Sequence, residues 1–277
     1  MIDLVVPLET GELREVAPTG RLIAGGTDLL VQMRDGRPVG RLIDVTNLVD
    51  GPAPAEVHDG HIRLSALAPI SDVVAAVGAR LPALTAAARD FGSVQIRNRA
   101  TIGGNLANAS PAADLAAVLV AAGADARVEG PDGGRTVPVA ALSTGPGSVS
   151  LDPGEWISTV EVPVPTGDEG FRKLGGRLAH AIAIVSLAWR WTRSADGSLK
   201  DVRLAYGAVA PTVIRVTEAE AELEGRIPTD AVVDRAAMAA CASVSPIDDI
   251  RAGADYRRAM VGELLREALT GNARRQE

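Results

Sequence analysis

Two short segments with adjacent glycines constrain what this chain can fold into: residues 24–28 (Ala-Gly-Gly-Thr-Asp) and residues 101–105 (Thr-Ile-Gly-Gly-Asn). The first follows an apolar stretch at 21–23 that predicts a strand, and it precedes residues 29–33, whose composition is helical. Strand, glycine turn and helix in this order are typical of a phosphate-binding loop, because glycine adopts positive φ and lets an anion reach the main-chain amides. The alternative is a plain turn in which Thr27 or Asp28 caps the next helix.

The second segment lies within a longer run, residues 91–115, in which Gln-Ile-Arg-Asn-Arg at 95–99 precedes Thr-Ile-Gly-Gly-Asn. This run resembles the FAD-binding medium subunit of the molybdenum hydroxylases, the family of aerobic carbon monoxide dehydrogenase and xanthine dehydrogenase. The two loops occur in the family's order and spacing. Further matches extend the resemblance over nearly the whole chain, at residues 42–45, 62–68, 153–155, 160–163, 171–174, 181–185, 248–251 and 255–258.

The resemblance implies which residues hold FAD, since in the family the two loops bind its pyrophosphate and ribityl chain. By matching positions, the expected contacts are Ala24, Gly25, Gly26, Thr27 and Asp28 from the first loop and Thr101, Gly103, Gly104 and Asn105 from the second. Asp114 matches an acid that reaches the sugar hydroxyls of the flavin nucleotide. Lys173 matches a lysine near the isoalloxazine, where positive charge would stabilise the anionic reduced flavin.

Several of these residues have a structural alternative. Asp114 could stabilise a helix start, with Ser110 as its N-cap and Pro111 in the first turn. Lys173 could be a solvated surface lysine. Phe91 and Ile96 match positions beside the adenine or the ring system, but an apolar side chain in an apolar segment is core by default.

Charge and cysteine content exclude several classes of function. The net charge of −7 and the absence of a basic tract argue against nucleic-acid binding. Cys241 is the only cysteine, so the chain has no internal disulfide and no ligand set for an iron–sulfur cluster. His58 and His61 flank a tight turn without further His or Cys nearby, and we predict no metal site. The longest apolar runs, such as 115–122, are too short to cross a bilayer.

The pattern of apolar and turn residues predicts an α+β fold with two domains. Residues 1–165 are expected to form a FAD-binding domain in two parts, about 1–50 and 55–165, of the PCMH and vanillyl-alcohol-oxidase-like type that the resemblance implies. Its expected elements after residue 50 are a hairpin at 56–64 turning at Asp59-Gly60, helices at 69–78, 81–90 and 111–122, and strands near 125–129, 135–138 and 156–163.

Residues 166–277 are expected to form a C-terminal domain with strands before helices. A three-stranded antiparallel sheet would use residues 170–175, 181–193 and 199–210, and a helical bundle would follow at 216–224, 229–243 and 253–269.

The resemblance predicts a cytoplasmic oxidoreductase subunit that holds FAD and has no catalytic side chain of its own. It would take electrons from the 2Fe-2S clusters of a small subunit, served by a large molybdenum-cofactor subunit, and pass them to NAD, oxygen or a quinone. The usual assembly would be a dimer of heterotrimers. Two alternatives are open: a self-sufficient flavin oxidoreductase acting on a small molecule or NAD(P)H, and a binding or assembly subunit that has lost its flavin.

Overall fold

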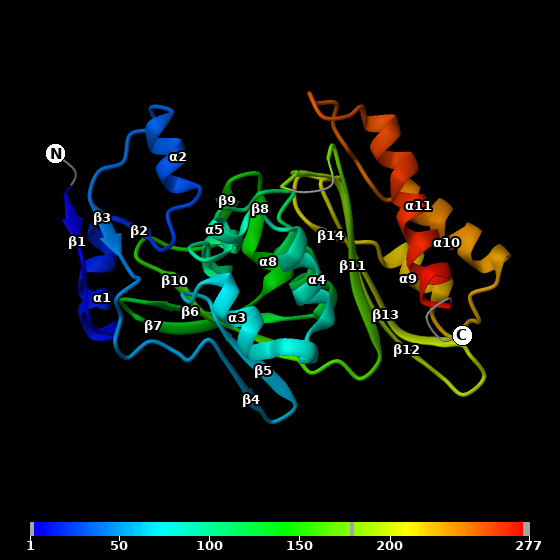
Figure 1. The fold of residues 1–277 in the computed structure, drawn as a ribbon, viewed down its shortest axis with the longest axis horizontal. Helices are drawn as coiled ribbons and strands as arrows, with labels where there is room; N and C mark the ends of the chain where they lie inside the picture. The colour runs from blue at the N-terminus through cyan, green and yellow to red at the C-terminus, as the bar shows by residue number, and fades with distance from the viewer. Residues whose placement is uncertain (1–2, 178–179, 274–277) are drawn as a thin grey trace. The chain divides into compact units, whose positions relative to one another are not determined.

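The chain divides into two compact units, each built from several stretches of sequence. The computed structural model describes residues 3–177 and 180–273 (Figure 1). The first unit comprises Met1–Gly78, Gly92–Ala109 and Ala124–Pro163, and the second comprises Ala79–Phe91, Ser110–Gly123 and Val164–Glu277. The second unit therefore takes two short stretches from the N-terminal half of the chain.

A small parallel sheet begins the first unit. Its strands pair in the order β1 (Leu4–Val5), β3 (Leu42–Asp44) and β2 (Arg21–Ile23). Helix α1 (Thr10–Val16) and the 3-10 turn η1 (Ala17–Thr19) precede β2, and α2 (Leu29–Arg34) leads from β2 to β3. The strand predicted at 21–23 and the helix predicted at 29–33 are confirmed as β2 and α2. Helix α1 was not predicted, because Leu13 is its only buried residue and leaves no apolar period.

A five-stranded antiparallel sheet forms the rest of the first unit's framework. Its order is β4 (Ala55–His58), β5 (His61–Ser65), β10 (Trp156–Pro163), β6 (Asp125–Gly130) and β7 (Gly133–Pro138). The predicted hairpin turn is confirmed, since Asp59 and Gly60 have φ values of 41° and 76°, both positive as a type I′ turn requires. The remaining elements are α3 (Ile70–Val77), α5 (Val94–Arg97), α6 (Ile102–Ala107), α8 (Val139–Leu142), and the ribbon of β8 (Ser143–Gly145) and β9 (Ser148–Val149).

The second unit is an antiparallel sheet with helices on both faces. Its four strands pair in the order β11 (Asp168–Gly175), β12 (Ala183–Arg193), β13 (Leu199–Gly207) and β14 (Ile214–Arg215). Helices α9 (Thr217–Leu223), α10 (Asp230–Ala242) and α11 (Ala254–Ala273) lie on one side of the sheet and α4 (Pro82–Asp90) on the other (Figure 1). Helix α7 (Asp114–Ala122) contacts α4, β12 and β13. The three predicted strands are confirmed; β14 has only two residues, too few to show a pattern.

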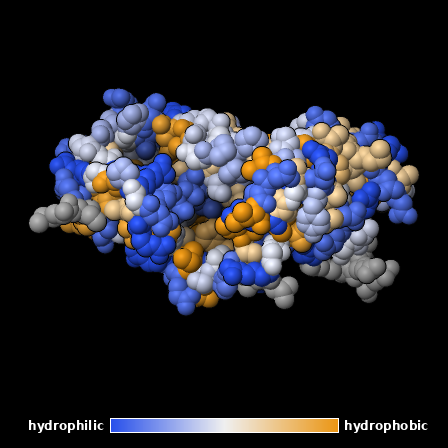
Figure 2. Space-filling view, turned by 90° about the horizontal axis from the view of Figure 1, so that it is seen from above, coloured by the Kyte–Doolittle hydropathy of each residue, from blue (hydrophilic) through white to orange (hydrophobic). Residues whose placement is uncertain are grey.

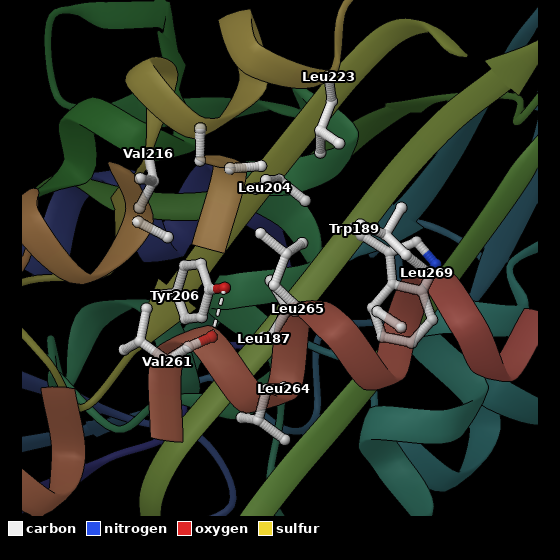
Figure 3. Close-up of a cluster of buried hydrophobic side chains, with 14 of the residues drawn as sticks. Leu187, Trp189, Leu204, Tyr206, Val216, Leu223, Val261, Leu264, Leu265 and Leu269 are labelled. Carbon is white, nitrogen blue, oxygen red and sulfur yellow. Dashed lines mark hydrogen bonds between the residues drawn. The ribbon is translucent and has the colours of Figure 1, made fainter. Parts of the chain in front are cut away.

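The core of the second unit lies between its sheet and α9–α11. Leu187, Trp189, Leu204 and Tyr206 from the sheet pack against α11 side chains (Figure 3). The Tyr206 hydroxyl, fully buried, donates a hydrogen bond to the main-chain oxygen of Val261 at 3.0 Å. This directional bond joins the C-terminal end of β13 to α11 within a largely apolar layer.

The chain's two tyrosines offer a matched test of this bond. We expect Tyr206→Phe to lower the free energy of unfolding by about 1 kcal/mol, since the buried hydrogen bond is lost while the ring still packs. Tyr256→Phe, at a half-exposed position, should leave it unchanged. Urea unfolding of both variants and the wild type measures the difference, and equal stabilities would contradict a structural role for the Tyr206 hydroxyl.

Candidate functional site

Four successive amide groups of the first glycine loop have no acceptor in the part of the chain that the structure describes. Within the described residues, the amides of 25–28 donate no hydrogen bond, although the carbonyls of Gly26 and Asp28 accept from Leu30 and Gln32. Gly26 has a φ of 69°, a conformation that favours glycine. No residue of this loop is buried. Consecutive free amides in an accessible turn are a typical site for phosphate oxygens.

Asp28 is the residue before α2, but its carboxylate caps no amide of the helix. It accepts a hydrogen bond from the side-chain amide of Gln32 instead. Asp28 therefore occupies the N-cap position that the alternative gives it, but its side chain makes no cap bond, and the loop amides have no acceptor among the described residues.

The two glycine loops are held near each other by main-chain contact inside the first unit. Gly25 lies so close to the main chain of Arg99 and Ala100 that no side chain would fit there. Gly103 donates to the main-chain oxygen of Ala66 at 2.8 Å, and a Cβ on Gly103 would lie 2.7 Å from that oxygen. These two glycines are required for close approach of the backbone, a role that the sequence alone did not reveal.

The second loop differs from the first because its amides have acceptors within the protein. The Thr101 hydroxyl accepts from the Gly104 amide at 3.0 Å and caps α6, while the Asn105 amide donates to the Thr101 carbonyl. Gly104 itself is exposed. The Asn105 side-chain oxygen Oδ1 is buried and has no hydrogen-bond partner within the described residues. An unpaired buried acceptor is costly, so Asn105 is suited to accept a hydroxyl donor from a ligand.

Lys173 and Asp114 form a buried ion pair in the second unit. Lys173 Nζ lies 2.6 Å from Asp114 Oδ2, each side chain is 7% exposed, and Nζ also donates to the main-chain oxygen of Asp90 at 2.6 Å. The alternative of a solvated surface lysine is therefore wrong. Asp90 was missed because it takes part through its carbonyl, which leaves no signal in the sequence.

Asp114 has one oxygen free for a ligand. Its Oδ1 is buried without a hydrogen-bond partner among the described residues. Burial raises the pKa of Asp114 to about 6, against the opposing effect of Lys173. A carboxylate in this state gains from any hydroxyl that donates to Oδ1.

Asp114 is also the first residue of α7, where a negative charge stabilises the helix dipole. The predicted helix start at 111 is wrong: Ser110 accepts from the Ala112 amide at 3.2 Å and caps a preceding turn. The helix-start role of Asp114 and its pairing with Lys173 therefore occur together.

A cavity of about 280 Å³ adjoins the Lys173 side chain. Residues 178 and 179 lie outside the described residues, and those that line the cavity are Asp90, Lys173, Leu174, Gly175, Gly176, Arg177, His180 and Ala181. A lysine ammonium carries three donor protons, of which Asp90 and Asp114 engage two. The expected site residues thus form two groups, the glycine loops in one unit and Asp114 with Lys173 in the other.

Other candidate residues have ordinary structural partners. His58 pairs with Glu161 at 2.8 Å, His61 Nδ1 lies 3.1 Å from the Asp59 carbonyl, and the Cys241 thiol contacts the Arg258 carbonyl at 3.1 Å. Across residues 3–177 and 180–273, no three His, Cys, Asp or Glu side chains gather in a metal-binding arrangement. In the same ranges no helix has the length and apolar character to span a bilayer.

Apolar residues also reach the surface, in separate places among hydrophilic ones (Figure 2). Ile96 is one of the exposed apolar residues, so its default assignment to the core is wrong. Phe91 is half-buried.

We expect Asp114 to make stability pH-dependent. An acid whose pKa is higher in the folded chain than in the unfolded chain stabilises the fold at low pH, and this contribution is lost as pH rises through the folded pKa. Between about pH 4 and 6, the free energy of unfolding of the wild type should fall relative to Asp114→Asn, by on the order of 2 kcal/mol. Urea unfolding at a series of pH values measures this, and parallel curves would contradict it.

Two family descriptions match consecutive parts of the chain. Residues 8–165 match the FAD-binding domain of molybdopterin dehydrogenases, and residues 170–271 match the C-terminal domain of CO dehydrogenase flavoproteins. Both glycine loops and Asp114 fall in the first match, and Lys173 falls in the second.

Individual relatives agree with these families along nearly the whole chain. The carbon monoxide dehydrogenase medium chain of Hydrogenophaga pseudoflava is 31% identical over 277 residues, covering 95% of this chain and 94% of that protein. The nicotine 6-hydroxylase medium subunit of Paenarthrobacter nicotinovorans is 32% identical, covering 90% and 88%. A solved structure of carbon monoxide dehydrogenase from Hydrogenophaga pseudoflava superposes with a TM-score of 0.92 at 31% identity, covering 97% and 96%. The chain therefore belongs to the family of FAD-binding medium subunits of molybdenum hydroxylases, which are oxidoreductases.

Proposed function

We propose that this chain is the electron-transfer subunit of a molybdenum hydroxylase and that its two glycine loops hold the diphosphate and ribityl part of a non-covalent FAD. The observation that carries the proposal is the set of amides at 25–28, which have no acceptor among the described residues and belong to an accessible turn packed against Arg99 and Ala100, directly before the second loop. Such a turn fits a diphosphate because phosphate oxygens accept several hydrogen bonds at once. Gly104 would let the ligand approach α6, and Asn105 would bond a hydroxyl.

Asp114 and Lys173 are proposed to act on other parts of FAD. Asp114 Oδ1, which has no partner among the described residues, would accept from a nucleotide hydroxyl. Lys173, held by two acceptors, would keep a fixed positive charge beside its cavity. A bound flavin supplies the ability to accept electrons singly and release them in pairs, and a fixed positive charge favours the reduced, anionic state. The side chains themselves bind and orient; none is required as a general base.

The relatives named as medium chains or subunits support a multi-subunit assembly for this chain. We propose a small partner with 2Fe-2S clusters that delivers electrons and a large partner with the molybdenum cofactor, in a dimer of heterotrimers. NAD, oxygen or a quinone would accept the electrons. We also propose that the FAD-binding domain ends near residue 165. Cytoplasmic location stays a prediction.

We expect Gly104→Ala to weaken FAD binding at least tenfold without loss of folding. The added Cβ meets only the Thr101 hydroxyl, at 3.1 Å, and alanine is the better helix former. Gly11→Ala is the matched control, because Gly11 also lies in a short helix and its Cβ would meet nothing within 4 Å. The measurement is the dissociation constant of FAD from the visible spectrum or from flavin fluorescence, with thermal unfolding recorded for each variant.

The outcomes separate the functions considered. Equal affinities of Gly104→Ala and the wild type would place the second loop outside the site. Absence of FAD from the wild type, both alone and co-purified with its partners, would contradict the whole proposal. Turnover of a small molecule or NAD(P)H by the isolated chain with FAD would favour the self-sufficient oxidoreductase instead.

A further inference from the structure

Two side chains of opposite charge on strand β11 bind the two ends of helix α4. Glu169 and Lys173 are four residues apart and so lie on the same face of β11. Glu169 Oε1 accepts from the Ala83 amide at the start of α4, at 3.1 Å, and Lys173 donates to the Asp90 carbonyl at its end, at 2.6 Å. Each charge is of the sign that stabilises the helix terminus it touches.

The two ends of helix α7 belong to the same network: the partner of Lys173 lies at its start, and the partner of Glu169 binds its end. Asp114, at its start, pairs with Lys173, and Arg190 NH1 donates to the carbonyl of Ala122, at its end, at 3.4 Å. Arg190 and Glu169 are directly opposite on β12 and β11 and pair at 2.7 Å, with side chains 12% and 3% exposed. Two buried ion pairs therefore connect the four ends of the two helices.

The separation of Glu169 and Lys173 along β11 is close to the length of α4 between the two groups that they bind. Four residues of strand span about 13 Å, and the seven-residue step from Ala83 to Asp90 spans about 10 Å of helix. Because a short helix is stiff along its axis, a shift of α4 at the end bound by Glu169 would also move the Asp90 carbonyl at its other end. Lys173 bonds both this carbonyl and Asp114, so the ion pair would move with it. Phe171 lies between Glu169 and Lys173 on β11 and is buried.

We propose that Glu169 and Arg190 are positioning residues for the Lys173–Asp114 pair. They act by fixing the far ends of α4 and α7, through the contacts of Glu169 with the Ala83 amide and of Arg190 with the Ala122 carbonyl. The link from this pair to flavin rests on the proposed function, whereas the link between the two ion pairs is a property of the chain itself and can be measured without FAD.

The protonation of Asp114 reports on the geometry of its pair. The charged groups that face it are Lys173 from β11 and Asp90 from α4, and Arg177 and His180 belong to the cavity beside them. Burial is the main cause of the raised pKa of Asp114. Any displacement of the helix ends that admits water should therefore lower that pKa toward the ordinary value of an aspartate.

The test is a pH titration of the full chain labelled with 13C at its aspartate carboxyl carbons, with the Asp114 signal identified by its loss in Asp114→Asn. We expect the pKa of Asp114 to fall from about 6 in Glu169→Gln. Exchanging the pair, Glu169→Arg with Arg190→Glu, should not restore it, because each helix end then faces the wrong charge. Glu267→Gln is the matched control, since Glu267 pairs with Arg172 on the opposite face of β11.

An unchanged Asp114 pKa in a folded Glu169→Gln variant would overturn the proposal. So would restoration of the wild-type value by the exchanged pair, which would show that mutual attraction alone is sufficient. If Glu169→Gln does not fold, Arg190→Lys serves in its place, because it keeps the charge but loses the two-nitrogen contact with Glu169. It should lower the pKa of Asp114 from about 6, and an unchanged pKa would overturn the proposal. FAD affinity, measured separately, should fall in the same variants. Absence of FAD binding in the wild type would contradict the proposed function but not the link between the two ion pairs.

Discussion

The main-chain contact of Gly25 with Arg99 and Ala100 is the constraint on which the arrangement of the first unit depends. It connects the end of a small parallel sheet with residues that lie 74 positions later in the sequence. A side chain at Gly25 would push these two segments apart, so this glycine is required by the fold itself, independently of any ligand. The ligand-facing duty falls instead on the free amides that follow it and on the exposed Gly104.

The two loops, similar in sequence, have different chemistry. In the first, the amides are unpaired among the described residues and the loop can bind an anion through its main chain. In the second, the Gly104 amide donates to the Thr101 hydroxyl, the Asn105 amide to the Thr101 carbonyl and the Gly103 amide to the Ala66 carbonyl. The side-chain amide of Asn105 and the exposed Cα of Gly104 are left for a ligand. Identical dipeptides of glycine therefore do not imply identical roles. The surrounding hydrogen bonds decide whether a glycine loop contacts a ligand through its N–H groups or only makes room for it.

Much of the fold could be predicted from the sequence because most elements are long enough to show a period, such as β12 or α10, or carry a decisive turn, such as Asp59-Gly60. Helix α1 and strand β14 lacked such a pattern. The candidate loops could be identified from local sequence, whereas the burial of Lys173 could not. Its two partners lie 83 and 59 residues away, and one of them contributes only a carbonyl. Contacts of this kind follow from tertiary packing, which a local pattern does not record.

The sharing of the N-terminal half between the two units has a consequence for biosynthesis. Helices α4 and α7 leave the ribosome well before β11, β12 and β13, the strands on which they pack. Until those strands arrive, the apolar faces of both helices have no sheet to cover, and contacts between residues far apart in sequence form slowly. A fragment beginning at residue 166 would have the converse defect, since it would carry the strands without the helices that cover one face. In the nascent chain, these two early helices therefore lack their packing partners until residues 168–207 have been made.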